Sequence, residues 1–292
     1  MALNHAGLIL VEPRPVRAAA DTRASATARA RAAVRHVAVL LPFALTGALY
    51  ELLRGAFSHR GTVHVGDLLA LESRWFSIST AQGRRPLSEV IASQPHAWLD
   101  LWCGATYLLF LIEIVGACLY LSFRSRSRAW ELSLGFLTVN LLGWLIWLHY
   151  PAAPPWYVDH YGLQSSVREV GSSAAGLLRF DALLGVPLAA SFYAKSANVF
   201  GAMPSLHVAY ATLVACTLAP LGWRLRLGAL AFALSMAFSA VYLRHHYVLD
   251  VLAGVLLALA VVGASRATRW LFGNARAAVV PRRAGAHGGG GE

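Results

Sequence analysis

The sequence is short of charged residues. Asp, Glu, Lys and Arg make up 13% of its 292 residues, whereas hydrophobic residues make up 57%. A soluble domain has about 25% charged residues, so too few polar side chains remain to cover a water-facing surface of this size. The shortage argues against a soluble protein and favours one embedded in a membrane, where a spanning helix needs about 20 mostly apolar residues.

Lysine and cysteine are scarce as well. Lys195 is the only lysine, so the net charge of +11 comes from arginine. The arginines stand between apolar runs and not on one basic module, so we expect no nucleic-acid partner. Cys103, Cys118 and Cys216 lie inside apolar runs and show no paired spacing such as CxxC. They indicate small buried side chains.

Six apolar segments divide the chain. Because every backbone group in the bilayer core must be satisfied within its segment, each of them predicts a helix. The sequence therefore predicts an all-α, polytopic transmembrane helical bundle of about six spans. The segments are 37–53, 98–123, 129–149, 206–221, 227–243 and 248–264.

The bundle is expected to form one catalytic domain between two cytoplasmic tails. The domain comprises residues 36–265. Residues 1–35, rich in Ala and Arg, predict a disordered basic tail, although their composition also resembles an organellar transit peptide. Residues 266–292 end in a Gly-rich stretch and predict a second disordered tail.

Arginine placement predicts the orientation in the membrane. The two tails and the connections after the second and fourth segments hold 16 of the 25 basic residues. Six alternating spans put these four regions on one side, which the positive-inside rule identifies as the cytoplasm. Segments 55–97 and 150–204 then face the other side, the first with an amphipathic helix at 66–76. We expect a multi-pass protein of a bacterial inner membrane.

Histidine and aspartate concentrate in two stretches, 201–207 and 242–250. Ionisable residues in a membrane are expensive and usually functional. One helix inward and one helix back return the chain to its starting height, so His207 and His246 should lie at the same outer level. His246 and Asp250, four residues apart, share a helix face, where the carboxylate can hold one imidazole nitrogen.

The predicted triad of His207, His246 and Asp250 suits phosphoryl transfer at the extracytoplasmic membrane surface. One imidazole can attack phosphorus while the other acts as acid and base. Charge on the phosphoryl oxygens needs N–H, O–H or cationic donors. The candidates for substrate binding are Ser205, which should cap the fourth helix, and Arg244, Lys195 and Arg179.

A metal site is the alternative interpretation of these side chains. His207, His245, His246 and Asp250 could ligate zinc, but no HExxH-type helix occurs. We expect no metal and no cofactor. His245 is expected to be a packing residue, since it neighbours His246 but points elsewhere on a helix.

At these positions the sequence resembles the type 2 phosphatidic acid phosphatase (PAP2) superfamily. Pro204-Ser205-Leu206-His207 is similar to its motif Pro-Ser-Gly-His, and its motif Ser-Arg-x5-His-x3-Asp falls on Ser239, Ala240, His246 and Asp250. Leu206 and Ala240 depart from the phosphatases, and the superfamily's first motif, Lys-x6-Arg-Pro, is absent.

These departures resemble the inositolphosphotransferase branch, the inositol phosphorylceramide synthases of fungi and their bacterial relatives. The likeness includes segments 150–157, 200–207 and 242–250, and Asp100 and Tyr107 resemble an upstream motif. It implies a six-helix bundle without metal, in which His246 is the nucleophile, Asp250 its orienting partner and His207 the acid and base. A glycerophospholipid such as phosphatidylinositol would donate its phosphorylated head group to a lipid hydroxyl.

Two further functions stay open at this point. A lipid phosphate or polyprenyl diphosphate phosphatase would use the same triad with water as the acceptor. Loss of the phosphatase-type Arg and Lys favours the transferase, because a phosphomonoester carries more charge to neutralise than a diester. A non-catalytic transporter or scaffold is the third hypothesis, although the paired, broken helices typical of transporters are not evident.

Overall fold

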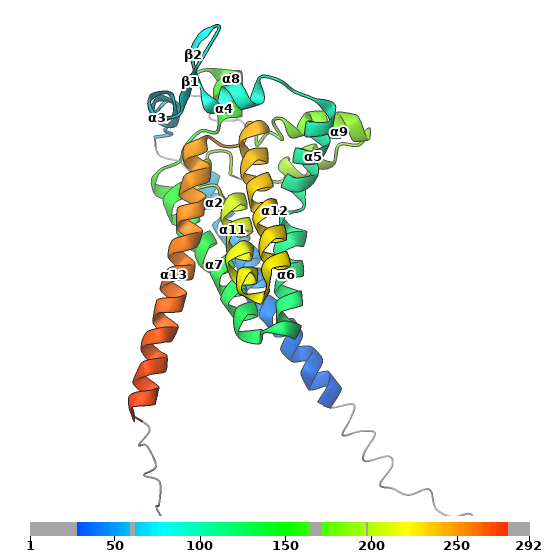
Figure 1. The fold of residues 1–292 in the computed structure, drawn as a ribbon. Helices are drawn as coiled ribbons and strands as arrows, with labels where there is room; N and C mark the ends of the chain where they lie inside the picture. Colours follow the sequence, from blue (N-terminus) through cyan, green and yellow to red (C-terminus); the bar gives the residue numbers. More distant parts are fainter. Residues whose placement is uncertain (1–27, 59–61, 164–170, 197, 280–292) are drawn as a thin grey trace, which may run out of the picture.

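The structure, a computed structural model, describes residues 28–58, 62–163, 171–196 and 198–279. Long helices form a bundle, and shorter elements cover one of its ends (Figure 1). The long helices are α2 (Leu41–Ser58), α5 (Ala97–Leu108), α6 (Phe110–Arg124), α7 (Arg126–His149), α11 (Leu206–Leu218), α12 (Trp223–Tyr242) and α13 (Val248–Val279). The shorter elements are η1 (Ala38–Leu40), α3 (Asp67–Trp75), β1 (Ser77–Thr80), β2 (Gly83–Pro86), α4 (Leu87–Ala92), α8 (Pro155–Tyr161), α9 (Leu177–Leu184), α10 (Leu188–Tyr193) and η2 (Ala219–Leu221).

All six predicted apolar segments are helical. Four of them lie in single helices long and apolar enough to cross a membrane: Ala28–Phe57, Arg126–His149, Trp223–Tyr242 and Val248–Leu271. A fifth lies in the bent pair α5 and α6, and the sixth is the shorter apolar helix Leu206–Leu221. The prediction of a helical, multi-pass membrane protein is therefore confirmed, and the predicted number of about six spans is roughly consistent with four or five long spans and one shorter apolar helix. Besides the helices, strands β1 and β2 form a small antiparallel hairpin.

The second predicted segment, 98–123, is not one straight helix. Helices α5 and α6 meet at Leu109 with a bend of 49°. Helix α5 packs against α9 and α12, whereas α6 packs against α7 and α11. Because the two halves bury their apolar faces against different partners, a straight helix would leave one of them uncovered. The bend also brings Tyr107 and Phe110 against the ring of His207.

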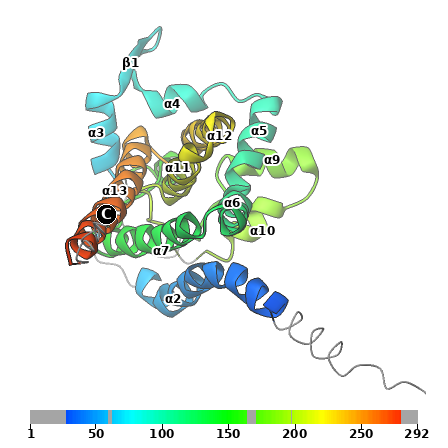
Figure 2. The ribbon, with the colours of Figure 1, turned by 60° about the horizontal axis from the view of Figure 1, so that its bottom comes forward.

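Helix α11 lies inside the bundle, with α6, α7, α12 and α13 around it (Figure 2). Ten of its 13 residues are buried, as expected for a helix that is apolar on all sides. Helix α2 packs on α7. The start of α11 approaches α13 so closely that a β-carbon at Gly254 would overlap the carbonyl oxygen of Ser205. This contact joins the two helices that carry His207 and Asp250.

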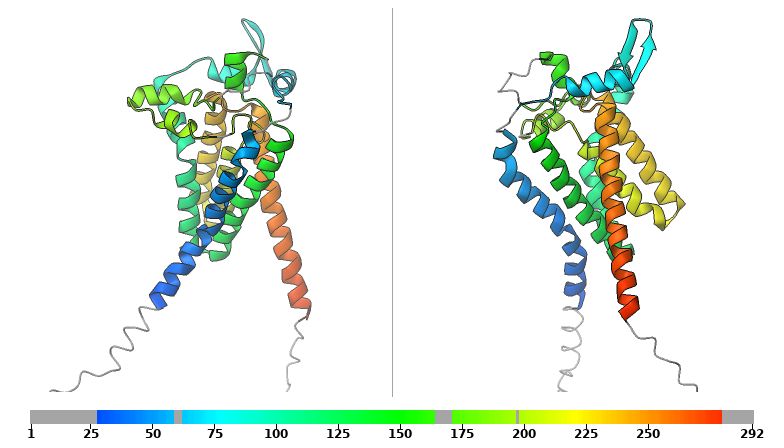
Figure 3. Two further views of the ribbon diagram at one scale, coloured as in Figure 1. Left: turned by 180° about the vertical axis from the view of Figure 1, so that it is seen from behind. Right: turned by 90° about the vertical axis from the view of Figure 1, so that its left-hand side faces the viewer.

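The N-terminal helix and α13 extend past the bundle at the end away from α3 and α9 (Figure 3). The turn between α6 and α7 and the turn at η2 lie at the same end (Figure 1), so the described arginines of the four Arg-rich regions gather there. Helix α13 continues beyond residue 265 to Val279. Residues 1–27 and 280–292 of the two predicted tails lie outside the described residues, and the domain boundaries stay predictions.

The opposite end is covered by segments that are tied together through the backbone. Ala152 forms parallel bridges to His64 and Gly201, and its N–H donates to the carbonyl of Phe200 at 2.9 Å. The predicted helix at 66–76 is α3. Residues 59–61, 164–170 and 197 of the two predicted outer segments lie outside the described residues.

Candidate active site

The three predicted catalytic side chains come together at the covered end of the bundle. His207 is the second residue of α11, Asp250 is the third residue of α13, and His246 lies in the turn between α12 and α13. The ring centroids of His207 and His246 are 6.4 Å apart. Asp250 is fully buried, His246 is 6% exposed, and His207 is half-buried. The two imidazoles therefore lie close together in a sheltered part of the structure.

The hydrogen bond of His246 determines which of its ring nitrogens is free. Its Nδ1 lies 2.8 Å from the carbonyl oxygen of Ala202. Because a carbonyl can only accept, Nδ1 carries the hydrogen and donates it. The other nitrogen, Nε2, then keeps a lone pair, which is the form that a nucleophile requires.

Asp250 is placed differently from the sequence-based expectation. Its Oδ2 lies 3.6 Å from Nδ1 of His246, which is an ion-pair contact and too long for a hydrogen bond. Instead, Oδ2 accepts the backbone N–H of Tyr247 at 2.7 Å, an interaction of the kind that caps a helix N-terminus. The carboxylate therefore lies in ion-pair contact with the imidazole without a hydrogen bond to it.

The carbonyl of Ala202 is held in place by the proline-rich segment before α8. Ala202 N–H donates to the carbonyl of Ala152 at 3.3 Å, and Ala153 N–H donates to the carbonyl of His64 at 3.0 Å. Residues that precede proline favour extended backbone, so Pro154 helps to keep Ala153 extended. The segment thus fixes the acceptor that orients His246.

His207 is oriented by two aromatic side chains. Its Nδ1 lies 3.2 Å from the hydroxyl of Tyr107, whose ring stacks on it with centroids 4.3 Å apart. The ring of Phe110 meets it edge-on at 4.6 Å. A phenol hydroxyl can donate or accept, so Tyr107 can stabilise either tautomer of His207. In either case the contact fixes the orientation of the ring.

The turn before His246 needs an unusual backbone conformation. Arg244 has φ = 63°, a left-handed conformation that commonly ends helices and is usually taken by glycine. It lets the N–H groups of His245 and His246 both donate to the carbonyl of Ala240, at 3.2 and 3.1 Å. Gly176 supports the turn by donating its N–H to the carbonyl of Leu243 at 3.0 Å.

His245 is a packing residue, as predicted, and its ring packs beside the triad. Its ring stacks between Tyr107 and Tyr193, with centroids 4.9 Å from each. Burial, together with the nearby His246 and His207, lowers the pKa of His245 well below its usual value. The sandwich holds a neutral ring beside the site, and through Tyr107 it connects to His207. An adjacent pair of histidines in the sequence gives no signal for this arrangement.

Ser205 and Arg244, both predicted to bind phosphate, lie next to the triad in the chain. Ser205 is fully buried at the start of α11, and its N–H donates to the carbonyl of Asp250 at 3.0 Å. Its side chain makes no capping hydrogen bond, contrary to expectation. Arg244 forms a two-pronged ion pair with Asp159, at 2.8 Å from Nε to Oδ2 and 2.5 Å from Nη2 to Oδ1.

Arg179 and Lys195, the other two predicted binders, come from more distant elements. Arg179 on α9 donates from Nε to Oδ1 of Asp100 at 2.8 Å and lies 5.4 Å above the ring of Tyr242. The hydroxyl of Tyr242 donates to the same Asp100 oxygen at 2.9 Å. Lys195 is exposed just after α10, and none of the described contacts joins its side chain to the triad.

Several buried polar atoms around the triad have no hydrogen-bond partner among the described residues. Buried polar groups in native proteins almost always have partners, so such atoms mark places where a ligand can supply them. Those in the segments that form the site are Ser205 Oγ, Arg244 Nη1, His245 Nε2, Tyr247 Oη and Asp250 Oδ1, and Arg179 Nη2 is a further one. Both arginines are thus anchored by a carboxylate and keep one buried nitrogen for another acceptor.

Glu72 on α3 is a buried acid that no motif or spacing in the chain singles out. Its Oε2 accepts the N–H of Val248, the first residue of α13, at 3.1 Å, and its Oε1 accepts the N–H of Ser88 at 3.3 Å. Burial raises the pKa of Glu72 above its usual value. Helix α3 thereby caps the helix that carries Asp250.

Comparison with known proteins places these residues in a family. The chain matches the sequence profile of the PAP2 superfamily over residues 66–264, which include the whole triad. The phosphoinositol dihydroceramide synthase of Bacteroides thetaiotaomicron is 37% identical over 227 residues, which cover 75% of this chain and 73% of that protein.

Fungal proteins are similar over a shorter region. The inositol phosphorylceramide synthase catalytic subunits of Schizosaccharomyces pombe and Saccharomyces cerevisiae are 32% and 33% identical over 177 and 175 residues. Each match covers 59% of this chain but only 42% and 43% of the fungal proteins, so the chain spans less than half of their length. No solved structure matches the chain significantly.

Proposed function

The chain belongs to the PAP2 superfamily, and on this basis we propose that it is a membrane phosphotransferase. It moves an inositol phosphate head group from a glycerophospholipid to the hydroxyl group of a ceramide-type lipid. The similarity to a phosphoinositol dihydroceramide synthase along most of both chains favours this reaction over the phosphatase alternative. The same similarity favours a bacterial inner membrane as its location.

The observation that carries the proposal is the close approach of two imidazoles, each of which has its Nδ1 already engaged. Reacting atoms in a productive complex approach to about 3–3.5 Å. Two such approaches, one from a nucleophile and one from an acid, need about 6–7 Å between the groups. With ring centroids 6.4 Å apart, His207 and His246 are close enough for one phosphate group to contact both rings.

In the first step, Nε2 of His246 attacks the phosphorus of the donor lipid. The bond between phosphorus and the diacylglycerol oxygen breaks, and His207, acting as an imidazolium, gives its Nε2 proton to the departing oxygen and becomes neutral with its hydrogen on Nδ1. The phosphorus is then bonded to His246 in a covalent inositol-phosphoryl intermediate. Asp250 stabilises the positive charge that this bond places on the imidazole.

In the second step the acceptor hydroxyl attacks phosphorus, and His246 is the leaving group. Nε2 of His207, now without its hydrogen, accepts the proton of the ceramide hydroxyl. The hydroxyl oxygen attacks phosphorus, the bond to Nε2 of His246 breaks, and His246 returns to its starting state. Throughout both steps Nδ1 of His207 keeps its hydrogen and donates it to the Tyr107 hydroxyl, so that only Nε2 exchanges a proton.

Three side chains are proposed to bind the phosphate and head group. The Ser205 hydroxyl and Nη1 of Arg244 are buried near the triad and lack partners among the described residues. They can donate to phosphoryl oxygens, where charge-assisted hydrogen bonds are strong. Arg179, anchored by Asp100, can donate its remaining nitrogen to the inositol ring or the phosphate. Lys195 lacks comparable support.

The site is proposed to lie on the extracytoplasmic side of the membrane. The described arginines of the four Arg-rich regions gather at the end of the bundle away from His246, and the positive-inside rule places that end in the cytoplasm. The segments over the site shelter His246, which is 6% exposed. Exclusion of water favours a lipid hydroxyl as the acceptor over hydrolysis.

A transfer assay with the purified full-length chain tests this function. Phosphatidylinositol labelled in its head group is supplied with and without dihydroceramide, to wild type, His246→Ala and His96→Ala. His96 is an exposed histidine at the same end, so it controls for loss of an imidazole. We expect transfer of label to dihydroceramide by wild type and His96→Ala, and none by His246→Ala. Release of label only as water-soluble inositol phosphate would instead identify a hydrolase.

A further inference from the structure

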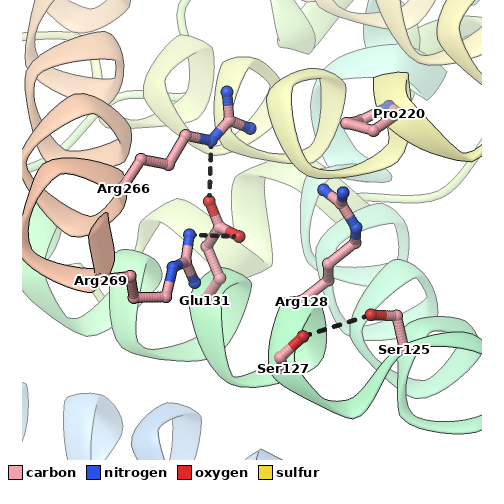
Figure 4. A pocket seen from close by; sticks show the side chains of 7 residues that line it. All are labelled: Ser125, Ser127, Arg128, Glu131, Pro220, Arg266 and Arg269. Atoms are coloured by element: carbon pink, nitrogen blue, oxygen red, sulfur yellow. Dashed lines mark hydrogen bonds and ion pairs between the residues drawn. The ribbon is translucent and has the colours of Figure 1, made fainter. Parts of the chain in front are cut away.

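A second polar site lies at the end of the bundle opposite the triad. Its cavity of about 530 Å³ lies between the start of α7, η2 and the far part of α13 (Figure 4). The cavity lies beside the end of α11, because Arg266, which lines it, donates from Nη2 to the carbonyl of Cys216 at 2.8 Å. The 13 residues of α11 rise by about 20 Å, which separates this cavity from His207. The lining residues are Ser125, Ser127, Arg128, Glu131, Pro220, Arg266 and Arg269.

The cavity carries fixed positive charge. Glu131, whose side chain is 3% exposed, binds Arg266 through Oε1 at 3.2 Å and Arg269 through Oε2 at 2.8 Å. Figure 4 shows both arginines reaching from α13 to this one carboxylate. Both of its oxygens are thus engaged. With Arg128, three cations and one anion line the cavity, which leaves a charge of +2.

Arg128 is the cation that remains available. It is half-buried one turn before Glu131 on α7, and none of the described hydrogen bonds or ion pairs involves its guanidinium group. Glu131 is already paired with two arginines, so it does not neutralise Arg128. A guanidinium group held in a cavity in this way matches the geometry of a phosphate oxygen pair.

The start of α7 adds donors to the same cavity. The helix is 24 residues long and begins after Ser125, so its positive dipole end and first N–H groups lie here. The hydroxyls of Ser125 and Ser127 are 3.4 Å apart. Hydroxyls, guanidinium groups and a helix N-terminus together recognise a phosphate group better than a carboxylate or a halide, because phosphate offers more acceptor oxygens.

The surroundings of the cavity are those of a lipid-facing surface. Arg269 is followed on α13 by Trp270 and Leu271, which are 66% and 59% exposed. Exposed Trp beside Arg is typical of the border between the acyl chains and the head groups. We propose that this cavity binds the phosphate group of an anionic phospholipid whose acyl chains lie along α13. The inference concerns a separate site and does not depend on the reaction at the triad.

Lipid binding to the purified full-length chain tests the proposal by native mass spectrometry. The probes are dioleoyl phosphatidylglycerol, zwitterionic dioleoyl phosphatidylcholine and inorganic phosphate. The test variant is Arg128→Gln, which leaves both ion pairs of Glu131 in place. Arg124→Gln is the matched control, because Arg124 lies at the same end of the bundle and does not line the cavity. Arg128→Lys keeps the charge.

We expect phosphatidylglycerol to bind wild type about tenfold more tightly than phosphatidylcholine. Arg128→Gln should lose about fivefold to tenfold of that affinity, as expected for one charge-assisted hydrogen bond. Arg124→Gln should stay close to wild type, and Arg128→Lys should fall between them. Displacement of the lipid by millimolar inorganic phosphate would show that free phosphate also satisfies the site. Equal losses in Arg128→Gln and Arg124→Gln, or equal binding of the two lipids, would refute the proposal.

Discussion

Helix α11 begins beside buried histidines and a buried aspartate, and it ends beside half-exposed arginines. At the first end, Asp250 Oδ1, Ser205 Oγ and His245 Nε2 are buried without partners among the described residues. At the second end, both oxygens of the buried Glu131 have arginine partners. The buried acid that joins two helices at the second end is therefore fully paired, whereas the buried acid at the first end keeps an unpartnered oxygen where we propose that a substrate is bound and transformed.

The largest expected effect is a loss of kcat on substitution of His207, which would sharpen the contrast between the two ends of α11. His207→Gln removes the acid and base while keeping a polar side chain, so kcat should fall by about 10²–10⁴-fold. Arg224→Gln, an exposed charge at the other end of α11, should leave kcat within about twofold of wild type. The labelled transfer assay measures both. A similar loss in the two variants would mean that the ends do not differ in function.

The architecture could be predicted from the sequence because it follows from apolar length. Six segments long and apolar enough for helices were found, and all six are helical. The bend at Leu109 could not be predicted, since neither proline nor glycine stands there. It depends on α9 and α11, which pack against the two halves from distant parts of the chain.

At the site, the spacing along the sequence predicted that His207, His246 and Asp250 lie together. It did not predict the hydrogen bonds that orient them. Ala202 holds His246 because a proline-rich segment 50 residues earlier positions its carbonyl. Glu72 contributes by capping α13 from a helix 176 residues away. Contacts of this kind join residues whose types and spacing carry no mutual signal, so they appear only in the folded chain.

The next largest effect concerns stability. A β-carbon at Gly176 would lie 2.8 Å from Cα of Leu243, a backbone atom that cannot move aside alone. Gly176→Ala should therefore destabilise the protein by about 1–3 kcal/mol through the turn that carries His246. Gly228→Ala in α12, where nothing lies within 4 Å, should be neutral or slightly stabilising. Thermal unfolding in detergent compares them, and equal melting temperatures would contradict the tight packing.

A smaller effect is expected for the hydroxyl of Tyr107. Tyr107→Phe keeps the stacked ring and removes only the hydrogen bond to His207, so kcat should fall about tenfold, which corresponds to about 1.4 kcal/mol. KM should change little, and the pH dependence of kcat should shift, because the hydroxyl acts through His207. Tyr120→Phe on α6, which is largely exposed, is the control. An unchanged pH profile would assign Tyr107 a packing role alone.

The smallest expected effect is the pH dependence of stability from His245. Burial lowers its pKa in the folded protein, so below pH 6.5 the unfolded chain binds a proton that the folded one does not. Stability should thus be present above this pH and be lost as the pH falls. His245 should account for about 0.8 kcal/mol between pH 7.5 and 6.0. The melting temperature of His245→Gln should depend less steeply on pH than that of wild type, and an equally steep dependence would contradict the assignment.

The covalent step at His246 is the central claim, and trapping the intermediate tests it most directly. The full-length chain is mixed with phosphatidylinositol labelled in its phosphate, without an acceptor, and quenched before analysis of the protein. We predict label bound to wild type through an acid-labile P–N bond at His246, chased onto dihydroceramide when that lipid is added, and absent from His246→Ala. Label that persists in His246→Ala, or full turnover without any labelled protein, would contradict the account.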